Sequence, residues 1–139
     1  MLMGKFTHNL DAKKRLFIPA KHREQLGDTF IITRNVDKCL SVFSLEEWEK
    51  YTEKLDSLPS TQAREIARFI YSNAADVQPD AQGRVLIPAE LLDYAGITKS
   101  AVVIGCGRHA EIWAEEIWNE RNSCEKTDSL TEKMIELGF

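Results

Sequence analysis

The spacing of apolar and polar residues divides the first part of the chain into short strands and a helix. Residues 4–10 alternate loosely between polar and apolar side chains, which predicts a strand, and residues 15–18 form a second, shorter strand after a turn. Pro19 fits the first position of a helix, where its missing N–H is not needed, and Gly27 is suited to ending that helix. A hairpin with strands at 29–34 and 39–43 follows.

The middle of the chain predicts two helices. Ser44 and Glu47 have the spacing of a capping box, which begins a helix that runs to about Leu55. A second helix is expected over about 61–74, because its apolar residues recur on one face. That face consists of Ile66, Phe69 and Ile70.

One ten-residue segment occurs twice. The sequence DAKKRLFIPA, residues 11–20, returns 69 residues later as DAQGRVLIPA, residues 80–89, with six identical positions. A helix-like stretch that ends in glycine follows each copy, then two β-rich runs and an acidic helix that carries a tryptophan. The chain therefore contains two copies of one β-turn-β-helix-β-β unit of roughly 45 residues. The elements expected in the second copy are strands near 75–78 and 84–87, a helix at 88–95, a hairpin, and a helix from about 114.

A unit of this size cannot bury a core alone, so the two copies must share one. We therefore expect an α+β, mainly β fold in which two tandem units form one pseudo-twofold β-barrel, with added helices. The helix at 61–74 is expected to link the copies and to cover an open face of the barrel. A capping box at Ser129 and Glu132 predicts a short terminal helix that docks on the rest. The expected boundaries are 5–48 for the first repeat, 49–74 for the linking helices, 75–119 for the second repeat and 128–139 for the C-terminal helix.

Charge is unevenly distributed along the chain. The net charge is −4, which argues mildly against a nucleic-acid partner. However, residues 1–70 carry 12 basic and 10 acidic side chains, whereas residues 71–139 carry 6 and 12. Between Lys5 and Arg23 six basic residues are opposed by a single acidic one, so the first half has a local basic patch. A solvated charged face explains such a patch about as well as a binding surface does.

The repeated segment also carries the residues best suited to contact DNA. Asp11 and Asp80 begin turns in which an Asp side chain can accept backbone N–H bonds two residues on, and each can hold the arginine four residues later. Arg15 and Arg84 have the planar fork of donors that suits phosphate oxygens and guanine edges. The alternative is that Asp and Arg merely tie the turn, but a surface ion pair stabilises a protein by only about 0–1 kcal/mol.

The two turns differ in charge. Lys13 and Lys14 stand in the first turn, where they add positive charges for phosphates, whereas Gln82 and Gly83 stand in the second. We therefore expect the first turn to contribute more to DNA binding than the second.

Other residues give weaker signals. The cysteines are odd in number and show no Cys-x-x-Cys pair, so they are expected to be buried or half-buried thiols. The histidines are isolated, and no nucleophile–base pair occurs, so we expect no metal, cofactor, small-molecule substrate or catalytic residue. The segment GCGRH predicts a hairpin turn, because a dinucleotide site would need a βαβ context. The tryptophans are expected to pack the core or a subunit contact.

No apolar run is long enough to span a membrane, and the first residues lack the apolar stretch of a signal peptide. These features favour a cytoplasmic protein.

The chain contains two Asp-x-x-x-Arg turns, each followed by two apolar residues and then Ile-Pro-Ala. These motifs, the duplication and the length of the chain resemble the MraZ family over essentially the whole sequence. The resemblance implies the AbrB-like, swapped-hairpin (SpoVT-AbrB) fold. It implies a bacterial DNA-binding transcriptional regulator, a repressor, that forms ring-shaped homo-oligomers on double-stranded DNA and associates with the nucleoid. It further implies action on the cell-division and cell-wall gene cluster, through short direct repeats in the protein's own promoter.

The fold alone leaves a second function open. A protein-interaction or antitoxin-like module could use the same fold without binding DNA. An enzyme is a distant third possibility.

Overall fold

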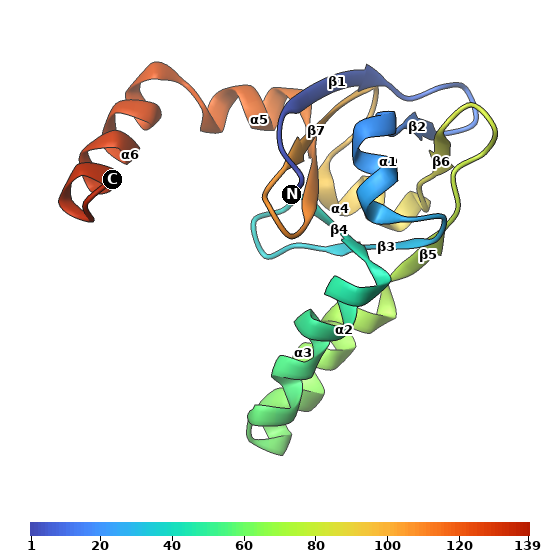
Figure 1. Ribbon diagram of the computed structural model, residues 1–139, viewed down its shortest axis with the longest axis horizontal. Helices are drawn as coiled ribbons and strands as arrows, with labels where there is room; N and C mark the ends of the chain where they lie inside the picture. The colour runs from blue at the N-terminus through green and yellow to red at the C-terminus, as the bar shows by residue number, and fades with distance from the viewer.

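The computed structural model describes all residues, 1–139, as a β-rich body from which two helical projections extend (Figure 1). The first half of the chain forms β1 (Lys5–Asn9), β2 (Arg15–Phe17), α1 (Ala20–Leu26), β3 (Phe30–Arg34), β4 (Leu40–Ser44) and α2 (Leu45–Glu53). A 3-10 turn, η1 (Lys54–Ser57), and α3 (Ser60–Ser72) follow. The second half forms β5 (Ala75–Val77), β6 (Arg84–Leu86), α4 (Ala89–Ala95), β7 (Ser100–Gly105), β8 (Ala110–Ala114), α5 (Glu115–Arg121) and α6 (Cys124–Glu136).

The strands of the two halves are interleaved. Six of them form one antiparallel sheet in the order β1-β7-β8-β4-β3-β5. The first strand of each half thus pairs with the hairpin of the other half, since β1 pairs with β7 and β5 pairs with β3. The short strands β2 and β6 pair with each other in a separate two-stranded ribbon.

The β-barrel expected from the sequence is not confirmed, because the sheet does not close on itself. The six-stranded sheet is open, with β1 and β5 as its two edges, and β2 and β6 do not join it. Helices α1 and α4 pack against the body instead (Figure 1).

The two halves share one hydrophobic core, as the sequence predicts. A single cluster of 20 buried apolar residues includes members of both halves. Ile18 and Ile87, the isoleucines of the two repeated segments, are each 1% exposed within it. Each segment therefore anchors its turn to the core at the end of a short strand.

Helices α2 and α3 form a hairpin that projects away from the sheet (Figure 1). The start of α2 is as expected, because Ser44 Oγ accepts a hydrogen bond from Glu47 N at 3.2 Å. Only the C-terminal end of α3 packs on the body, where Ile70 is buried and Thr33 Oγ1 donates to its carbonyl oxygen at 2.7 Å. Ile66 is 41% exposed, so α3 does not cover an open side of the sheet.

The N-terminal residues are built into the body. Leu2 is buried and forms an antiparallel bridge with Gly107. A Cβ at Gly105 would overlap the backbone of Leu2 and Met3, so only glycine fits where the two segments cross. His22 is buried, and its Nε2 lies 2.9 Å from the Met3 carbonyl oxygen.

Helix α6 follows the outer end of α5 and extends further from the body, so it does not dock on the rest of the protein (Figure 1). It follows Ser123, so the expected start at Ser129 is wrong and Ser129 lies inside the helix. All of its residues are exposed, including the apolar side chains of Leu130, Met134 and Ile135. None of the helices is both long and apolar enough to span a membrane.

Candidate nucleic-acid interface

The first repeated turn is held by the side chain of Asp11. Its Oδ1 accepts hydrogen bonds from the backbone N–H groups of Lys13 and Arg15, both at 2.9 Å. Its Oδ2 accepts a charge-assisted bond from Arg15 Nε at 2.7 Å. The carboxylate therefore fixes both the loop and the direction of the arginine, as the sequence predicts.

The second turn repeats this arrangement. Asp80 Oδ1 accepts from the N–H groups of Gln82 and Arg84, both at 2.9 Å, and Oδ2 accepts from Arg84 Nε at 3.0 Å. The same spacing in the sequence thus gives the same local geometry 69 residues later.

Strand pairing brings the two turns together. Because β2 and β6 pair antiparallel, with Arg15 opposite Leu86 and Phe17 opposite Arg84, the turns emerge side by side. Arg15 Nη1 lies 3.6 Å from Asp80 Oδ2, and Arg84 Nη1 lies 3.5 Å from Asp11 Oδ2. All four side chains are between 27% and 34% exposed, so they form a half-exposed cluster in which two positive and two negative charges cancel.

The hydrogen bonds at each turn stabilise the charged carboxylates. The backbone N–H of Arg15 lowers the pKa of Asp11 below its ordinary value, and the Arg15 side chain and the Lys13 N–H add to this effect. The pKa of Asp80 is lowered in the same way, first by the backbone N–H of Arg84. Both aspartates are therefore ionised in the folded protein at neutral pH.

The residues between Asp and Arg give the two turns different charges. Lys13 and Lys14 are exposed, and the ion pairs at the turns involve only the aspartates and arginines. Lys14 has φ +63°, in the left-handed region, and Gly83 occupies the same place in the second turn with φ +81°. A Cβ at Gly83 would lie 2.8 Å from the guanidinium carbon of Arg23, so a larger residue there would require the Arg23 side chain to shift.

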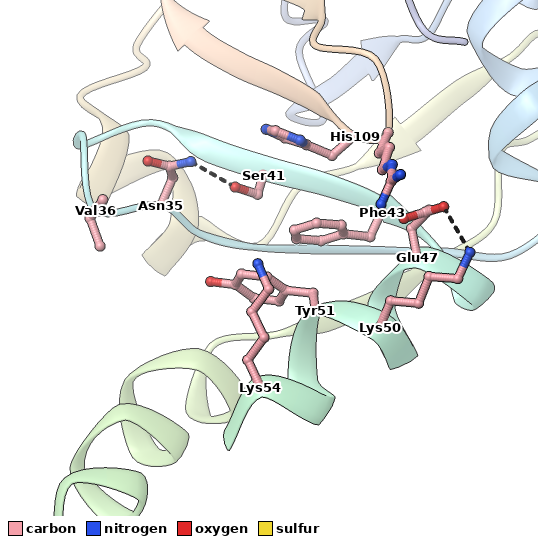
Figure 2. Close-up of a pocket in the computed structure, with 10 residues that line it drawn as sticks. Asn35, Val36, Ser41, Phe43, Glu47, Lys50, Tyr51, Lys54 and His109 are labelled. Atoms are coloured by element: carbon pink, nitrogen blue, oxygen red, sulfur yellow. Dashed lines mark hydrogen bonds and ion pairs between the residues drawn. The ribbon is translucent and has the colours of Figure 1, made fainter. Parts of the chain in front are cut away.

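A shallow pocket lies elsewhere, between α2, β4 and the β7–β8 turn (Figure 2). The rings of Tyr51 and His109 stack on Phe43, with centroids 4.6 and 5.5 Å from it. The tryptophans have the packing role expected, since Trp113 is buried and Trp48 and Trp118 are half-buried.

The cysteines and one histidine depart from expectation. Cys39 is buried, but Cys106 and Cys124 are exposed. Cys106, His109 and Glu111 also come together at the β7–β8 turn. Although Cys106 as a whole residue is exposed, its thiol is partly surrounded by protein atoms, and this desolvation together with the charge of Glu111 raises the pKa of the thiol to about 11. The sequence does contain a signal for this group, a Cys-x-x-His spacing across a predicted hairpin turn.

Comparison with known proteins identifies the family. The model of the family described as "MraZ protein, putative antitoxin-like" matches the chain twice, over residues 1–68 and 70–136. The chain belongs to the MraZ family. The resemblance inferred from the two Asp-x-x-x-Arg turns is thereby confirmed.

Full-length MraZ relatives agree in length as well as sequence. The "Transcriptional regulator MraZ" of Clostridium acetobutylicum is 47% identical over 142 residues, with all of both chains covered. Proteins of the same name from Carboxydothermus hydrogenoformans and Thermoanaerobacter sp. are 44% and 45% identical, with 98% of this chain and 95% of each relative covered. These MraZ relatives are named as regulators, not enzymes, in agreement with the sequence.

Proposed function

We propose that this protein is a sequence-specific, DNA-binding transcriptional regulator, and that the paired Asp-x-x-x-Arg turns contact the DNA. The observation that carries the proposal is the pairing of β2 with β6, which brings both arginines together beside the turn that contains the exposed Lys13 and Lys14. The names of the relatives support the same function.

In this proposal the arginines of the cluster and the lysines beside it have different roles. Each arginine is held by its own aspartate through Nε and lies near the aspartate of the other turn through Nη1, which leaves Nη2 to donate to base edges or phosphate oxygens. Since the charges of the four clustered side chains cancel, the net attraction to phosphate comes from Lys13 and Lys14 beside them. Arginine then reads the site while lysine positions the protein.

We extend the proposal to the target and the assembly implied by the family resemblance. The protein represses the cell-division and cell-wall gene cluster by binding short direct repeats in its own promoter, as a ring of identical subunits at the nucleoid in the cytoplasm. Two observations support self-association. One half of the chain is acidic and the other mildly basic, and α6 with the residue that follows it exposes Leu130, Met134, Ile135 and Leu137. Contacts between unlike surfaces close into rings when the rotation permits.

We also propose that the two halves are copies of one AbrB-like unit, with residues 5–48 and 75–119 as the repeats and 49–74 as the linker. The double match to the family model, the repeated order of elements and the reciprocal exchange of first strands support this origin. The related pairings also support a pseudo-twofold axis between β2 and β6.

An interaction module of the antitoxin type without DNA binding is the second candidate. The description of the family as antitoxin-like and the uncovered apolar face of α6 favour it. This module would use its helical projections to bind a protein, and its Asp–Arg turns would serve only as structural ties.

Fluorescence anisotropy with DNA from upstream of the protein's own gene separates the two candidates. We expect tight binding at low salt, weaker binding as salt rises, and at least tenfold lower affinity for a shuffled duplex of equal length. Equal affinity for both duplexes would contradict sequence-specific binding. No binding of either duplex by the folded protein would favour the interaction module.

A further inference from the structure

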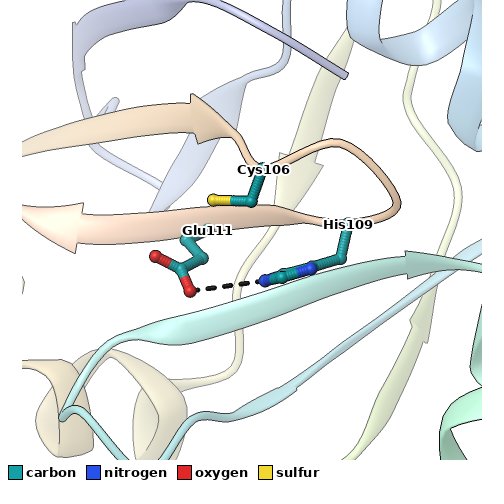
Figure 3. Close-up of side chains that lie close together, drawn as sticks. All are labelled: Cys106, His109 and Glu111. Carbon is teal, nitrogen blue, oxygen red and sulfur yellow. Dashed lines mark hydrogen bonds and ion pairs between the residues drawn. The ribbon is translucent and has the colours of Figure 1, made fainter. Parts of the chain in front are cut away.

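The β7–β8 turn carries three side chains with the chemistry of a metal site (Figure 3). One ligand atom each of Cys106, His109 and Glu111 lies within 4.8 Å of the other two. We propose that this turn binds a divalent transition-metal ion, with Zn²⁺ as the best fit, through Cys106 Sγ, a His109 ring nitrogen and a Glu111 carboxylate oxygen.

The hairpin register explains why these residues meet. In the β7–β8 pair, Val102 lies opposite Trp113 and Ile104 lies opposite Glu111. Continuing the same register places Cys106 opposite His109, and the Cys106 N–H donates to the His109 carbonyl oxygen at 2.8 Å. Opposed residues of an antiparallel pair point to the same face, so the three donors share one side of the turn.

The distances suit a small tetrahedral ion. Zinc–sulfur bonds of about 2.3 Å and zinc–nitrogen or –oxygen bonds of about 2.0 Å place the ligand atoms about 3.3–3.6 Å apart. His109 Nε2 already lies 3.3 Å from Glu111 Oε2. Only small side-chain movements are then needed, and the fourth position is left for water or another ligand.

Neighbouring groups hold the glutamate in place. Glu111 Oε1 accepts a hydrogen bond from Trp113 Nε1 at 3.0 Å, and Asn35 Nδ2 donates to Oε2 at 3.3 Å. His109 is held by stacking on Phe43. Such outer partners orient metal ligands and raise affinity.

The chemistry of the donors selects the class of ion. A thiolate, an imidazole and a carboxylate favour Zn²⁺ over Mg²⁺ or Ca²⁺, which prefer oxygen ligands alone. Binding requires the thiolate, so the Cys106 proton leaves to solvent as the metal–sulfur bond forms.

This site is separate from the proposed DNA contact. The Lys5 end of β1 pairs with Ile104, beside the metal turn, whereas the Asn9 end, which leads to the Asp11 turn, pairs with Ser100. The two proposals therefore succeed or fail independently.

The test titrates the reduced, full-length protein with Co²⁺, whose thiolate complexes show a charge-transfer absorption, followed by displacement with Zn²⁺. We expect one ion per chain and a charge-transfer band that Zn²⁺ abolishes. Cys106→Ser should remove the band, and Glu111→Gln should lower the affinity by more than about tenfold. Cys124→Ser, at the other exposed thiol, is the matched control and should bind as the wild type does.

Circular dichroism confirms that each variant is folded before its titration is interpreted. Absence of the charge-transfer band in the wild type, or its persistence in Cys106→Ser, would overturn the proposal. Loss of the band in Cys124→Ser with retention in Cys106→Ser would also overturn it, because the thiolate would then come from α6.

Discussion

The Asp11–Arg15 and Asp80–Arg84 turns have nearly the same geometry but different charges. In both, one carboxylate accepts two backbone N–H bonds at 2.9 Å and holds the arginine Nε, at 2.7 Å in the first turn and 3.0 Å in the second. After a shared alanine, the two residues before the arginine are lysines in the first turn, and glutamine and glycine in the second. The difference teaches that aspartate determines the shape of the turn, while the loop residues determine how strongly it attracts an anion.

The left-handed residue makes the contrast sharper. Glycine adopts this conformation at little cost, whereas a lysine there is strained by about 1 kcal/mol. The first turn nevertheless has Lys14 at that position. A strained charged residue on an exposed turn is consistent with a role in binding rather than in folding.

The largest expected effect is the loss of an arginine. Arg15→Ala should lower affinity for the promoter DNA by about 10- to 100-fold per subunit, because a well-placed bidentate contact is worth about 1–3 kcal/mol. Arg84→Ala should lower the affinity less, since its turn lacks the two adjacent lysines that we propose to contact phosphate. Anisotropy titrations measure both, with light scattering to verify an unchanged oligomer. A larger decrease in affinity for Arg84→Ala than for Arg15→Ala would show that the second turn contributes more to DNA binding than the first.

The second effect concerns salt. Changing both Lys13 and Lys14 to alanine should weaken binding and reduce the slope of log K against log salt by up to about 1.8 per subunit, about 0.9 for each phosphate that is no longer neutralised. The converse variant Gln82→Lys adds a cation to the second turn and should steepen the slope. If neither variant changes the slope over a salt series, the lysines do not face the DNA.

Stability should respond in opposite directions at the left-handed positions. Lys14→Gly relieves the strain at φ +63° and should raise the free energy of unfolding by up to about 1 kcal/mol, while DNA affinity falls. Gly83→Ala should lower the free energy of unfolding by more than about 1 kcal/mol. The new methyl group would contact Arg23, and alanine is strained in the left-handed conformation at this position. Urea unfolding measures both changes in the free energy of unfolding. Two changes of the same sign would contradict the conclusion that the backbone is strained at Lys14 but not at Gly83.

Low pH should reduce the stability that Asp11 and Asp80 give to the fold, and this is the smallest of the four predicted effects. The pKa values of Asp11 and Asp80 are lower in the folded protein than their ordinary value of 3.8. Their stabilisation is therefore complete above pH 3.8 and is lost as the pH falls through the lower folded values. Thermal unfolding between pH 5 and 2 should show a smaller acid-induced decrease in Tm for Asp11→Asn and Asp80→Asn than for the wild type. Equal decreases in all three proteins would mean that other carboxylates dominate.

Much of the fold follows from local patterns. The bounds of β1, α1 and α4 lie within one or two residues of those expected, because proline and glycine mark the helix ends and the apolar spacing marks the strands. The capping bond at Ser44 and both Asp–Arg bonds are also local, so the sequence was sufficient to predict them.

The features that escaped prediction depend on distant contacts. Nothing in the repeat specifies that β1 pairs with β7 while the sheet stays open, because this choice depends on strand lengths and packing across halves. The neutral cluster of four side chains also requires the β2–β6 pairing. A helix without proline or glycine propagates beyond a plausible cap, which is why α6 extends back to Cys124 instead of beginning near Ser129.

The exchange of first strands determines what a cut in the chain between the two halves would do. Each half lacks an edge strand that only the other half supplies, so neither is a complete folding unit. The exposed 3-10 turn Lys54–Ser57, at the far end of the α2–α3 projection, joins the two halves away from the shared core. A cut there would convert an intramolecular assembly into a bimolecular one, whose stability depends on fragment concentration. The molecule is in this sense a dimer whose two partners are kept at a fixed effective concentration by a helical tether.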